Sequence, residues 1–340
     1  MMKNIFFSAC FFLLAFGITA CNKDQDGTIQ TPKQKIRLLS IGNSYSQDAL
    51  AYVPFIFQNM GADVDLHLGI LMQSSSTASM HVDNFTNQTV AYTFNYYAGG
   101  GSWNNNSSKK TIQWALDNYE WDIIVLQGAP QSSIHASYYQ TNMVLYNLVY
   151  SYVSEHGGYP IKFAWYQTIV RPAIANGSNS GVNSGVNRSE EEQLKMYQDG
   201  VVFAQEMMNN TDFKFLFPVG TAVRNARTNP ALDILGDYST HPNNSSEKGY
   251  FSAYDGVHLQ EGLPCLTAAY TFCQKLSNEF NLGISILDDS TIPDASWASG
   301  KNIPGPHGKP IGLTKENIEL VKRAVMAAIK NPYEITDMQH

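Results

Sequence analysis

Hydrophobic residues follow two alternating spacings along the body of the chain. Short apolar runs typical of buried strands lie at residues 36–41, 122–126, 161–165 and 213–217, and residues 64–68 alternate weakly like one more strand. Between these runs, apolar residues recur at helical spacing in residues 49–60, 111–118, 138–156, 189–209, 263–278 and 313–329. Strands separated by helices pair in parallel, because each connection crosses over the sheet. The pattern therefore predicts an α/β protein built as a three-layer α/β/α sandwich.

Local signals mark where several helices begin and end. Ser189 and Glu192 have the spacing of a capping box and predict the start of the helix in residues 189–209. Pro54 lies inside the apolar pattern of residues 49–60, so this helix is expected either to kink there or to begin later than its first apolar residue.

Three polar segments interrupt this alternation. Residues 74–110 contain an alternating stretch before Gly99-Gly100-Gly101, which predicts an added β-hairpin. Residues 174–188 are mainly Gly, Ser and Asn and predict a mobile loop, and residues 224–252 are polar and rich in turn formers. Long loops of this kind are either binding surface or insertions without a binding role, and the sequence leaves both readings open.

The first residues have the pattern of a targeting signal. Lys3 precedes an apolar run at residues 5–18, which is short for a bilayer span and suits a signal-peptide core over residues 1–20. Ile18-Thr19-Ala20-Cys21 resembles a bacterial lipobox, which implies a lipidated Cys21 anchoring the protein to the cell envelope, in the outer membrane and facing the periplasm or the cell surface. The alternative is a secretory signal with an incidental Cys21. Residues 21–34 read as a flexible tether to a domain at 35–332.

Charge and cysteine content narrow the choice of partners. The chain has 22 basic and 29 acidic residues, and this acidic balance argues against nucleic acid as a partner. Besides Cys10 and Cys21, it has Cys265 and Cys273, eight positions apart in a helical pattern and too distant for an unstrained disulfide. We expect buried thiols there. The histidines show no helical ligand pair, so the sequence predicts neither a metal nor another cofactor.

Candidate chemistry is found in two short motifs far apart in the chain. Gly42-Asn43-Ser44 follows the first predicted strand, and ligands of open parallel sheets bind beyond the carboxyl ends of strands. A serine nucleophile needs an imidazole base and a carboxylate that orients it. Asp255 and His258 are spaced so that both side chains fall on one side of a turn. A helix from about Asp48 would point its N-terminal amides toward Ser44.

Each motif alone has an ordinary structural explanation, but the two together resemble the SGNH or GDSL family of serine esterases and lipases. The resemblance covers about residue 36 to the C-terminal helix, and Asn43 stands where the family usually has Asp. It implies a flavodoxin-like parallel sheet in which Ser44 is the nucleophile, His258 the general base and then acid, and Asp255 the orienting carboxylate. The closest match is a divergent branch of the family found in bacterial envelope lipoproteins.

The oxyanion hole implied by the resemblance combines Ser44 with a glycine after the second strand and an asparagine after the third. Gly69 takes the glycine position, with Ser74 or Ser75 as alternatives if the loop begins later. The family's Gly-x-Asn-Asp is absent, and Gln127 stands there instead. Gln presents the same amide group as Asn on one more carbon, so Gln127 is a candidate donor.

Two functions remain open. The first is a carboxylic ester hydrolase that deacylates an esterified glycan or a related small ester; the α/β-hydrolase elbow fits worse, because Ser46 replaces its final glycine. The second is a catalytically weak or inactive glycan-binding envelope lipoprotein on the same fold. Aromatic residues near the strand ends suit sugar faces but are also ordinary core material: Tyr45, Tyr96, Tyr97, Trp103 and Tyr166.

Overall fold

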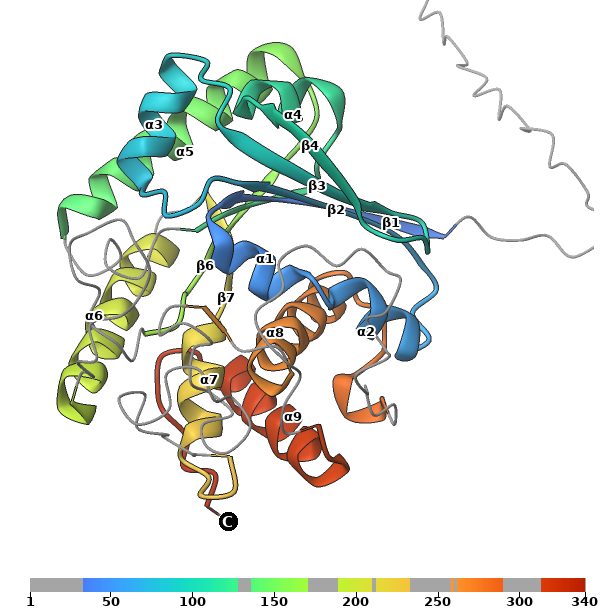
Figure 1. The fold of residues 1–340 in the computed structure, drawn as a ribbon, viewed down its shortest axis with the longest axis vertical. Helices are drawn as coiled ribbons and strands as arrows, with labels where there is room; N and C mark the ends of the chain where they lie inside the picture. Colours follow the sequence, from blue (N-terminus) through green and yellow to red (C-terminus); the bar gives the residue numbers. More distant parts are fainter. Residues whose placement is uncertain are drawn as a thin grey trace, which may run out of the picture. The chain divides into compact units, whose positions relative to one another are not determined.

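Among the described residues, seven strands form one sheet in the order β4-β3-β2-β1-β5-β6-β7 (Figure 1). The parallel strands are β1 (Gln34–Gly42), β2 (Val64–Met72), β5 (Ile123–Leu126), β6 (Lys162–Tyr166) and β7 (Phe213–Phe217). The antiparallel strands β3 (Tyr92–Ala98) and β4 (Asn104–Lys110) extend the sheet beside β2. The parallel strands therefore run in the order β2-β1-β5-β6-β7, which is the flavodoxin-like order.

The computed structural model describes residues 33–127, 136–170, 189–209, 212–232, 258–259, 262–289 and 313–339. The described residues from Gln34 onward cluster as one unit. Several predicted features lie outside the described residues: the signal peptide at 1–20, Cys21, the segment 174–188, most of 224–252, and Asp255.

Helices cover both faces of the sheet (Figure 1). One face carries α1 (Ser44–Leu50), α2 (Val53–Asn59), α7 (Val219–Arg227), α8 (Leu263–Glu279) and α9 (Lys315–Lys330). The other carries α3 (Ala78–Thr86), α4 (Ile112–Asn118), α5 (Ala136–His156) and α6 (Glu190–Asn209). A short 3₁₀ helix, η2 (Ile286–Asp288), also packs into the first layer.

Strand β1 shows why the helices divide into two layers. Successive side chains of a strand point to opposite faces of its sheet. Ile36 and Leu38 accordingly belong to the hydrophobic core on the α8 side, whereas Leu39 and Ile41 belong to the core on the α5 side. All four are fully buried, as expected of a central parallel strand covered on both faces. The expectation of a mixed α/β protein with helices on both sides of a mostly parallel sheet is confirmed.

The apolar pattern predicted most elements within a few residues but missed two helices. Residues 49–60 form two helices, with α2 beginning at Val53 and Pro54 in its first turn, where a missing N–H costs nothing. The capping box is present, because Glu192 N donates to Ser189 Oγ at 3.1 Å and Ser189 N donates to Glu192 Oε2 at 2.7 Å. Helices α3 and α7 were not predicted: α3 lies in the polar segment 74–110, and the end of α7 overlaps the polar segment 224–252.

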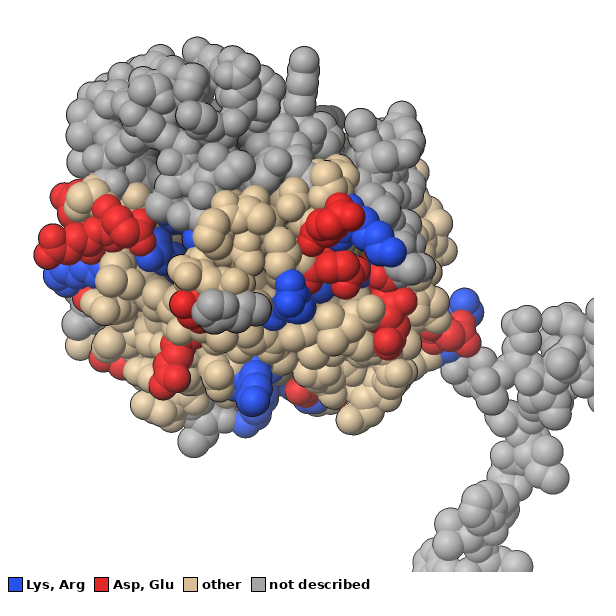
Figure 2. Space-filling model, turned by 90° about the horizontal axis from the view of Figure 1, so that it is seen from below, with Lys and Arg blue, Asp and Glu red and all other residues tan. Residues whose placement is uncertain are grey.

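The hairpin expected in residues 74–110 is confirmed as β3 and β4. Its turn contains Gly99 and Gly100 with φ angles of +58° and +89°, a region that side chains rarely adopt. Cys265 and Cys273 are buried thiols, again as expected. In the described part of the chain, no helix is long and apolar enough to cross a bilayer. Figure 2 shows acidic and basic side chains interspersed on one face of the molecule.

Candidate active site

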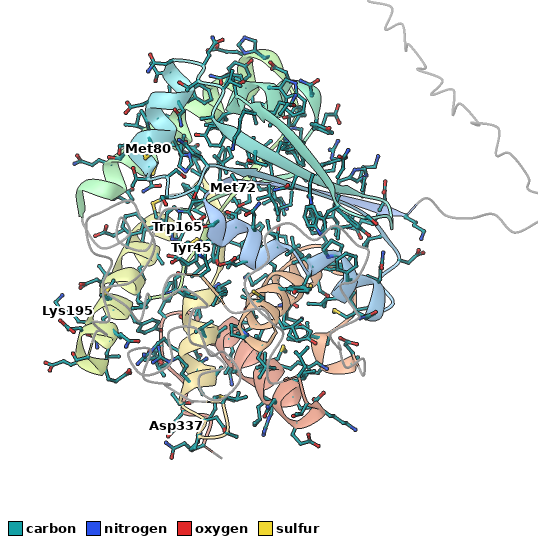
Figure 3. The ribbon with its side chains drawn as sticks, viewed as in Figure 1. Tyr45, Met72, Met80, Trp165, Lys195 and Asp337 are labelled. Carbon is teal, nitrogen blue, oxygen red and sulfur yellow. The ribbon has the colours of Figure 1, made fainter. Side chains whose placement is uncertain are left out.

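Ser44 lies at the point where the strand order reverses. From β1 the sheet continues to β2 on one side and to β5 on the other, and crevices form at such switch points beyond the carboxyl ends of the strands. Gly42, the last residue of β1, is in register with Met72 at the end of β2. Figure 3 labels Met72 together with Tyr45, the neighbour of Ser44, at this edge. The structure therefore places Ser44 where a ligand of this fold would bind.

The side chains of Ser44 and His258 form a hydrogen bond. His258 Nε2 and Ser44 Oγ are 2.7 Å apart, and both residues are only partly buried. The remaining residues of α1, from Tyr45 to Leu50, are buried. Ser44 is thus the one residue of this helix that solvent and a substrate can reach, and it already contacts a group that can accept its proton.

Helix α1 begins at Ser44, earlier than we expected. Asn43 is its N-cap, with extended backbone at φ −120° and a side chain that accepts a hydrogen bond from Tyr45 N at 3.1 Å. The expectation of a helix starting near Asp48 was wrong, because polar residues fill the first turn and hide the helical spacing of Tyr45, Ala49 and Leu50. Asn43 therefore fixes the backbone directly before the candidate nucleophile.

Gln127 extends from the end of β5 to the backbone that carries Ser44. It is 2% exposed, and its Oε1 accepts hydrogen bonds from Asn43 N and from Ser46 Oγ, each at 3.0 Å. A Cβ on Gly42 would lie 2.4 Å from this oxygen and 2.6 Å from Ser46 Oγ. Glycine is therefore required at position 42 for close packing. The carbonyl of Gln127 positions the turn, while its role as an oxyanion donor stays a prediction.

Gly69 does not lie in the loop where we placed it. Strand β2 continues to Met72, so Gly69 is inside the sheet, paired with Leu39 on one side and Tyr96 on the other. A Cβ at this position would lie 2.6 Å from the ring of Trp121. The prediction that Gly69 is an oxyanion donor is therefore wrong. This residue lies inside the sheet, and its lack of a side chain makes room for the buried indole of Trp121.

The loop after β2 begins at Gln73 and runs beside Asn43. Gln73 N donates to Gly42 O at 3.1 Å, and Asn43 Nδ2 donates to the carbonyl oxygen of Ser76 at 3.1 Å. Ser74 and Ser75, the alternatives to Gly69, are exposed in this loop, and Ser75 has a φ of +56°. This loop, rather than Gly69, is the part of the β2 connection that lies next to the site.

A buried histidine holds the same loop from behind. His81 is fully buried, with Nε2 3.1 Å from Ser76 Oγ and Nδ1 2.8 Å from Tyr92 Oη. Burial lowers the pKa of His81 to about 4, so its imidazole is neutral at pH 7. Ser76 Oγ also donates to Gln73 O at 2.8 Å. No periodic pattern of apolar residues predicts this network, since α3 lies in a polar segment.

Asp48 is a second site residue that sequence reasoning missed. Its side chain is 1% exposed, and Oδ2 accepts a hydrogen bond from the backbone N–H of Leu259 at 3.1 Å. Leu259 directly follows His258, and Asp48 lies one helical turn after Ser44. The spacing from Ser44 could have drawn attention to Asp48, but its partner is 211 residues away in sequence.

The aromatic residues proposed as a sugar-binding surface belong mainly to the core. Tyr45, Tyr97, Trp103 and Tyr166 are each no more than 2% exposed. Their polar atoms have internal partners: Trp103 Nε1 donates to Ala51 O at 2.9 Å, and Tyr166 Oη donates to Tyr45 O at 3.4 Å. Of the five, only Tyr96 is partly exposed. Core packing is therefore the correct reading of the other four.

Within the parts of the chain that the structure describes, no three His, Cys, Asp or Glu side chains lie together as a metal site would require. The described geometry is that of a serine and a histidine in hydrogen-bond contact, beside a helix cap, a glutamine carbonyl and a buried carboxylate. This is the arrangement of a candidate acyl-transfer site on an α/β fold.

Residues 37–298 match the family described as "Domain of unknown function (DUF4886)", and the chain belongs to this family. A crystal structure of a DUF4886 family protein from Bacteroides uniformis ATCC 8492 shares the fold, with a TM-score of 0.63 and 24% identity over 89% of this chain and 98% of its own. A gut microbial diltiazem-metabolizing enzyme aligns at a TM-score of 0.38 and 12% identity, over 72% of this chain and 47% of its own. No curated protein matches the chain.

Proposed function

We propose that this protein is a serine hydrolase of the SGNH/GDSL type, which cleaves carboxylic esters by acyl transfer to Ser44. The single observation that supports this most is the 2.7 Å contact between Ser44 Oγ and His258 Nε2 at the switch point of the sheet. A hydroxyl and an imidazole at this distance, partly open to solvent, have the geometry of a nucleophile and its general base.

The reaction has two halves. His258 takes the proton of Ser44 as Oγ attacks the ester carbonyl carbon, and the same imidazole then gives this proton to the departing alcohol. The acyl group remains on Ser44 until His258 deprotonates a water molecule that attacks it, which releases the carboxylic acid and restores the serine. Asp255, as the resemblance implies, would orient the imidazole.

The negative charge on the ester oxygen needs hydrogen-bond donors. We assign the backbone N–H of Ser44 and the side-chain amide of Gln127 to this role, and we replace Gly69 by the exposed Ser74–Ser75 part of the loop after β2. The supporting contacts are those that bring this loop and Gln127 to Asn43, the residue before the nucleophile. One such donor contributes on the order of 10²–10³-fold to kcat.

The substrate class is an esterified glycan or a related small ester. The proposed location in the cell envelope supports this substrate class. In this proposal residues 1–20 are removed, and a lipidated Cys21 holds the domain at a bacterial membrane, the outer membrane in preference. The burial of Trp103 and Tyr97 removes one argument for a sugar ligand. A small ester without a glycan is therefore an equal candidate substrate. The chemistry requires no cofactor, and we assign no nucleic-acid partner.

One observation favours a second function, that of a glycan-binding protein with little or no turnover. The carbonyl of Gln127 is held by Asn43 N and Ser46 Oγ, and the family's asparagine block is absent, so the oxyanion hole is the weakest part of the site.

A substitution at Gln127 tests its role as a donor. Gln127→Glu keeps the acceptor oxygen and removes the amide donor. A drop of about 10²-fold in kcat would support the donor role of Gln127, and an unchanged kcat would remove it.

The decisive experiment compares wild-type protein with Ser44→Ala. We expect wild-type protein to hydrolyse p-nitrophenyl acetate and to be labelled by a fluorophosphonate at Ser44, and we expect Ser44→Ala to do neither. Ser154→Ala, at an exposed position on α5, is the control and should behave as wild type. Equal hydrolysis by wild-type and Ser44→Ala proteins would remove the enzyme proposal and leave the binding protein.

A further inference from the structure

Helix α1 carries a carboxylate on the same face as Ser44. Residues four apart on a helix are neighbours along one face, so Asp48 lies one turn behind the candidate nucleophile. Ser44 is partly exposed, whereas Asp48 is 1% exposed. The helix therefore carries one polar group that solvent can reach and a second, acidic one that is buried.

The partner of Asp48 is the backbone next to the candidate base. Leu259 N donates to Asp48 Oδ2 at 3.1 Å, and the carbonyl oxygen of Leu259 lies 3.6 Å from Cys265 Sγ on α8. Both polar groups of the Leu259 backbone are thus bound by buried side chains, one from α1 and one from α8. These two contacts fix the backbone directly after His258.

Tyr166 completes the buried polar environment of Asp48. Burial raises the pKa of the Tyr166 phenol well above its usual range, and the negative charge of Asp48 raises it further. The phenol is therefore neutral, and it donates to the carbonyl oxygen of Tyr45 at 3.4 Å. A buried carboxylate is costly unless it is hydrogen-bonded, so its presence here requires partners such as the Leu259 amide.

We propose that Asp48 is a positioning residue that fixes the distance between the side chains of His258 and Ser44. One rigid helical turn carries both the nucleophile and the carboxylate, and that carboxylate holds the backbone on which the base is mounted. The contact between Ser44 Oγ and His258 Nε2 is therefore fixed from two sides, through the side chains and through the Leu259 amide. This inference rests on the proposed hydrolase function.

The reason for such a device is the sensitivity of proton transfer to distance. A displacement of about 1 Å in a reacting group can cost about 100-fold in rate. Without the Asp48 carboxylate, the amide of Leu259 would lose its partner inside the protein, and the backbone carrying His258 would shift toward water to satisfy it. The loss would appear in kcat more than in KM, because Asp48 itself is buried away from the substrate.

The test uses Asp48→Ala, Asp48→Asn and a matched control, Asp122→Ala. Asp122 binds the Arg37 side chain at 2.7 Å at the opposite end of the strands, so its loss lowers stability without touching the site. We expect Asp48→Ala to lower kcat for p-nitrophenyl acetate and the rate of fluorophosphonate labelling about 100-fold, with KM changed less than about threefold. Asn retains an acceptor for Leu259 N, so Asp48→Asn should recover most of the rate.

Wild-type rates in folded Asp48→Ala would overturn the proposal, and so would an equal loss in Asp48→Asn, which would assign the effect to charge. If wild-type protein neither hydrolyses esters nor reacts with the fluorophosphonate, the proposed hydrolase function is wrong. The positioning of His258 by Asp48 can still be tested alone, by NMR titration of the His258 ring. Asp48→Ala must change the imidazole signals of His258 while Asp122→Ala leaves them unchanged. Unchanged His258 signals in Asp48→Ala would overturn the inference.

Discussion

His258 Nε2 lies 2.7 Å from Ser44 Oγ, although 214 residues separate the two along the chain. Ser44 comes directly after the central strand β1, and His258 comes shortly before α8, which packs on the same face of the sheet as α1. The packing of α1 against α8 therefore brings the two distant motifs into contact. If both side chains take part in the same chemical step, the loss of either one should abolish that step.

The first prediction concerns this pair of residues. Ser44→Ala and His258→Ala should each lower kcat/KM for p-nitrophenyl acetate by on the order of 10⁴-fold or more, because neither group activates an ester carbonyl without the other. The double variant should be no slower than the slower single variant. Losses that multiply in the double variant would show that the two residues act independently, contrary to the proposal.

The sequence predicted the parts of the fold that obey a simple period. Strands such as Ile123–Leu126 are continuous apolar runs, because both faces are covered. Helix α7 escaped detection because Arg224 and Arg227 are buried in it, and both guanidinium groups pair with Glu190 of α6. A polar residue buried through a distant ion pair has no signature in the local pattern.

The site was predictable where a motif carried it and not where tertiary contacts did. Ser44 and His258 could be found from their motifs, and the structure brings their side chains together. Gly69 was misplaced because we took the glycine as the end of the strand, although the apolar residues 70–72 continue β2 beyond it. The absence of a side chain at Gly69 leaves room for the ring of Trp121, which comes from another segment. Asp48 was missed because its partner, Leu259, adjoins it only in the folded protein.

The second prediction tests the packing role of Gly69. A Cβ on this residue would lie 2.6 Å from the Trp121 ring, so Gly69→Ala should lower the free energy of unfolding by about 1–3 kcal/mol. In a Trp121→Phe background the same change should cost less, because the smaller ring leaves room for the methyl group. Urea unfolding of the four proteins measures this coupling. Equal costs in both backgrounds would contradict it.

The third prediction separates two glycines by their surroundings. Gly42→Ala should lower both stability and kcat, because its Cβ would lie 2.4 Å from Gln127 Oε1 and would displace the turn before Ser44. Gly200 in α6 is the matched control, since a Cβ there meets no atom within 4 Å. Gly200→Ala should raise the free energy of unfolding by about 0.5–1 kcal/mol and leave kcat unchanged. An active, stable Gly42→Ala would refute the packing argument.

The fourth prediction is a pH dependence of stability that arises from His81. Burial lowers its pKa from 6.5 to about 4 in the folded protein. Between these pH values the unfolded chain binds a proton that the folded protein does not, so the free energy of unfolding falls as the pH is lowered through this window. The loss reaches up to about 3 kcal/mol at pH 4, by the conversion of one pKa unit to about 1.4 kcal/mol.

Urea titrations at pH 7 and pH 4.5 measure this effect, with His81→Gln and His156→Gln as the pair of variants. His81→Gln removes the titrating group, so it should lose stability at pH 7 and show a weaker dependence on pH than wild-type protein. His156 is exposed at the end of α5, and its replacement should leave the wild-type pH dependence in place. If His81→Gln kept the full pH dependence, the proton uptake would have to be assigned to other groups.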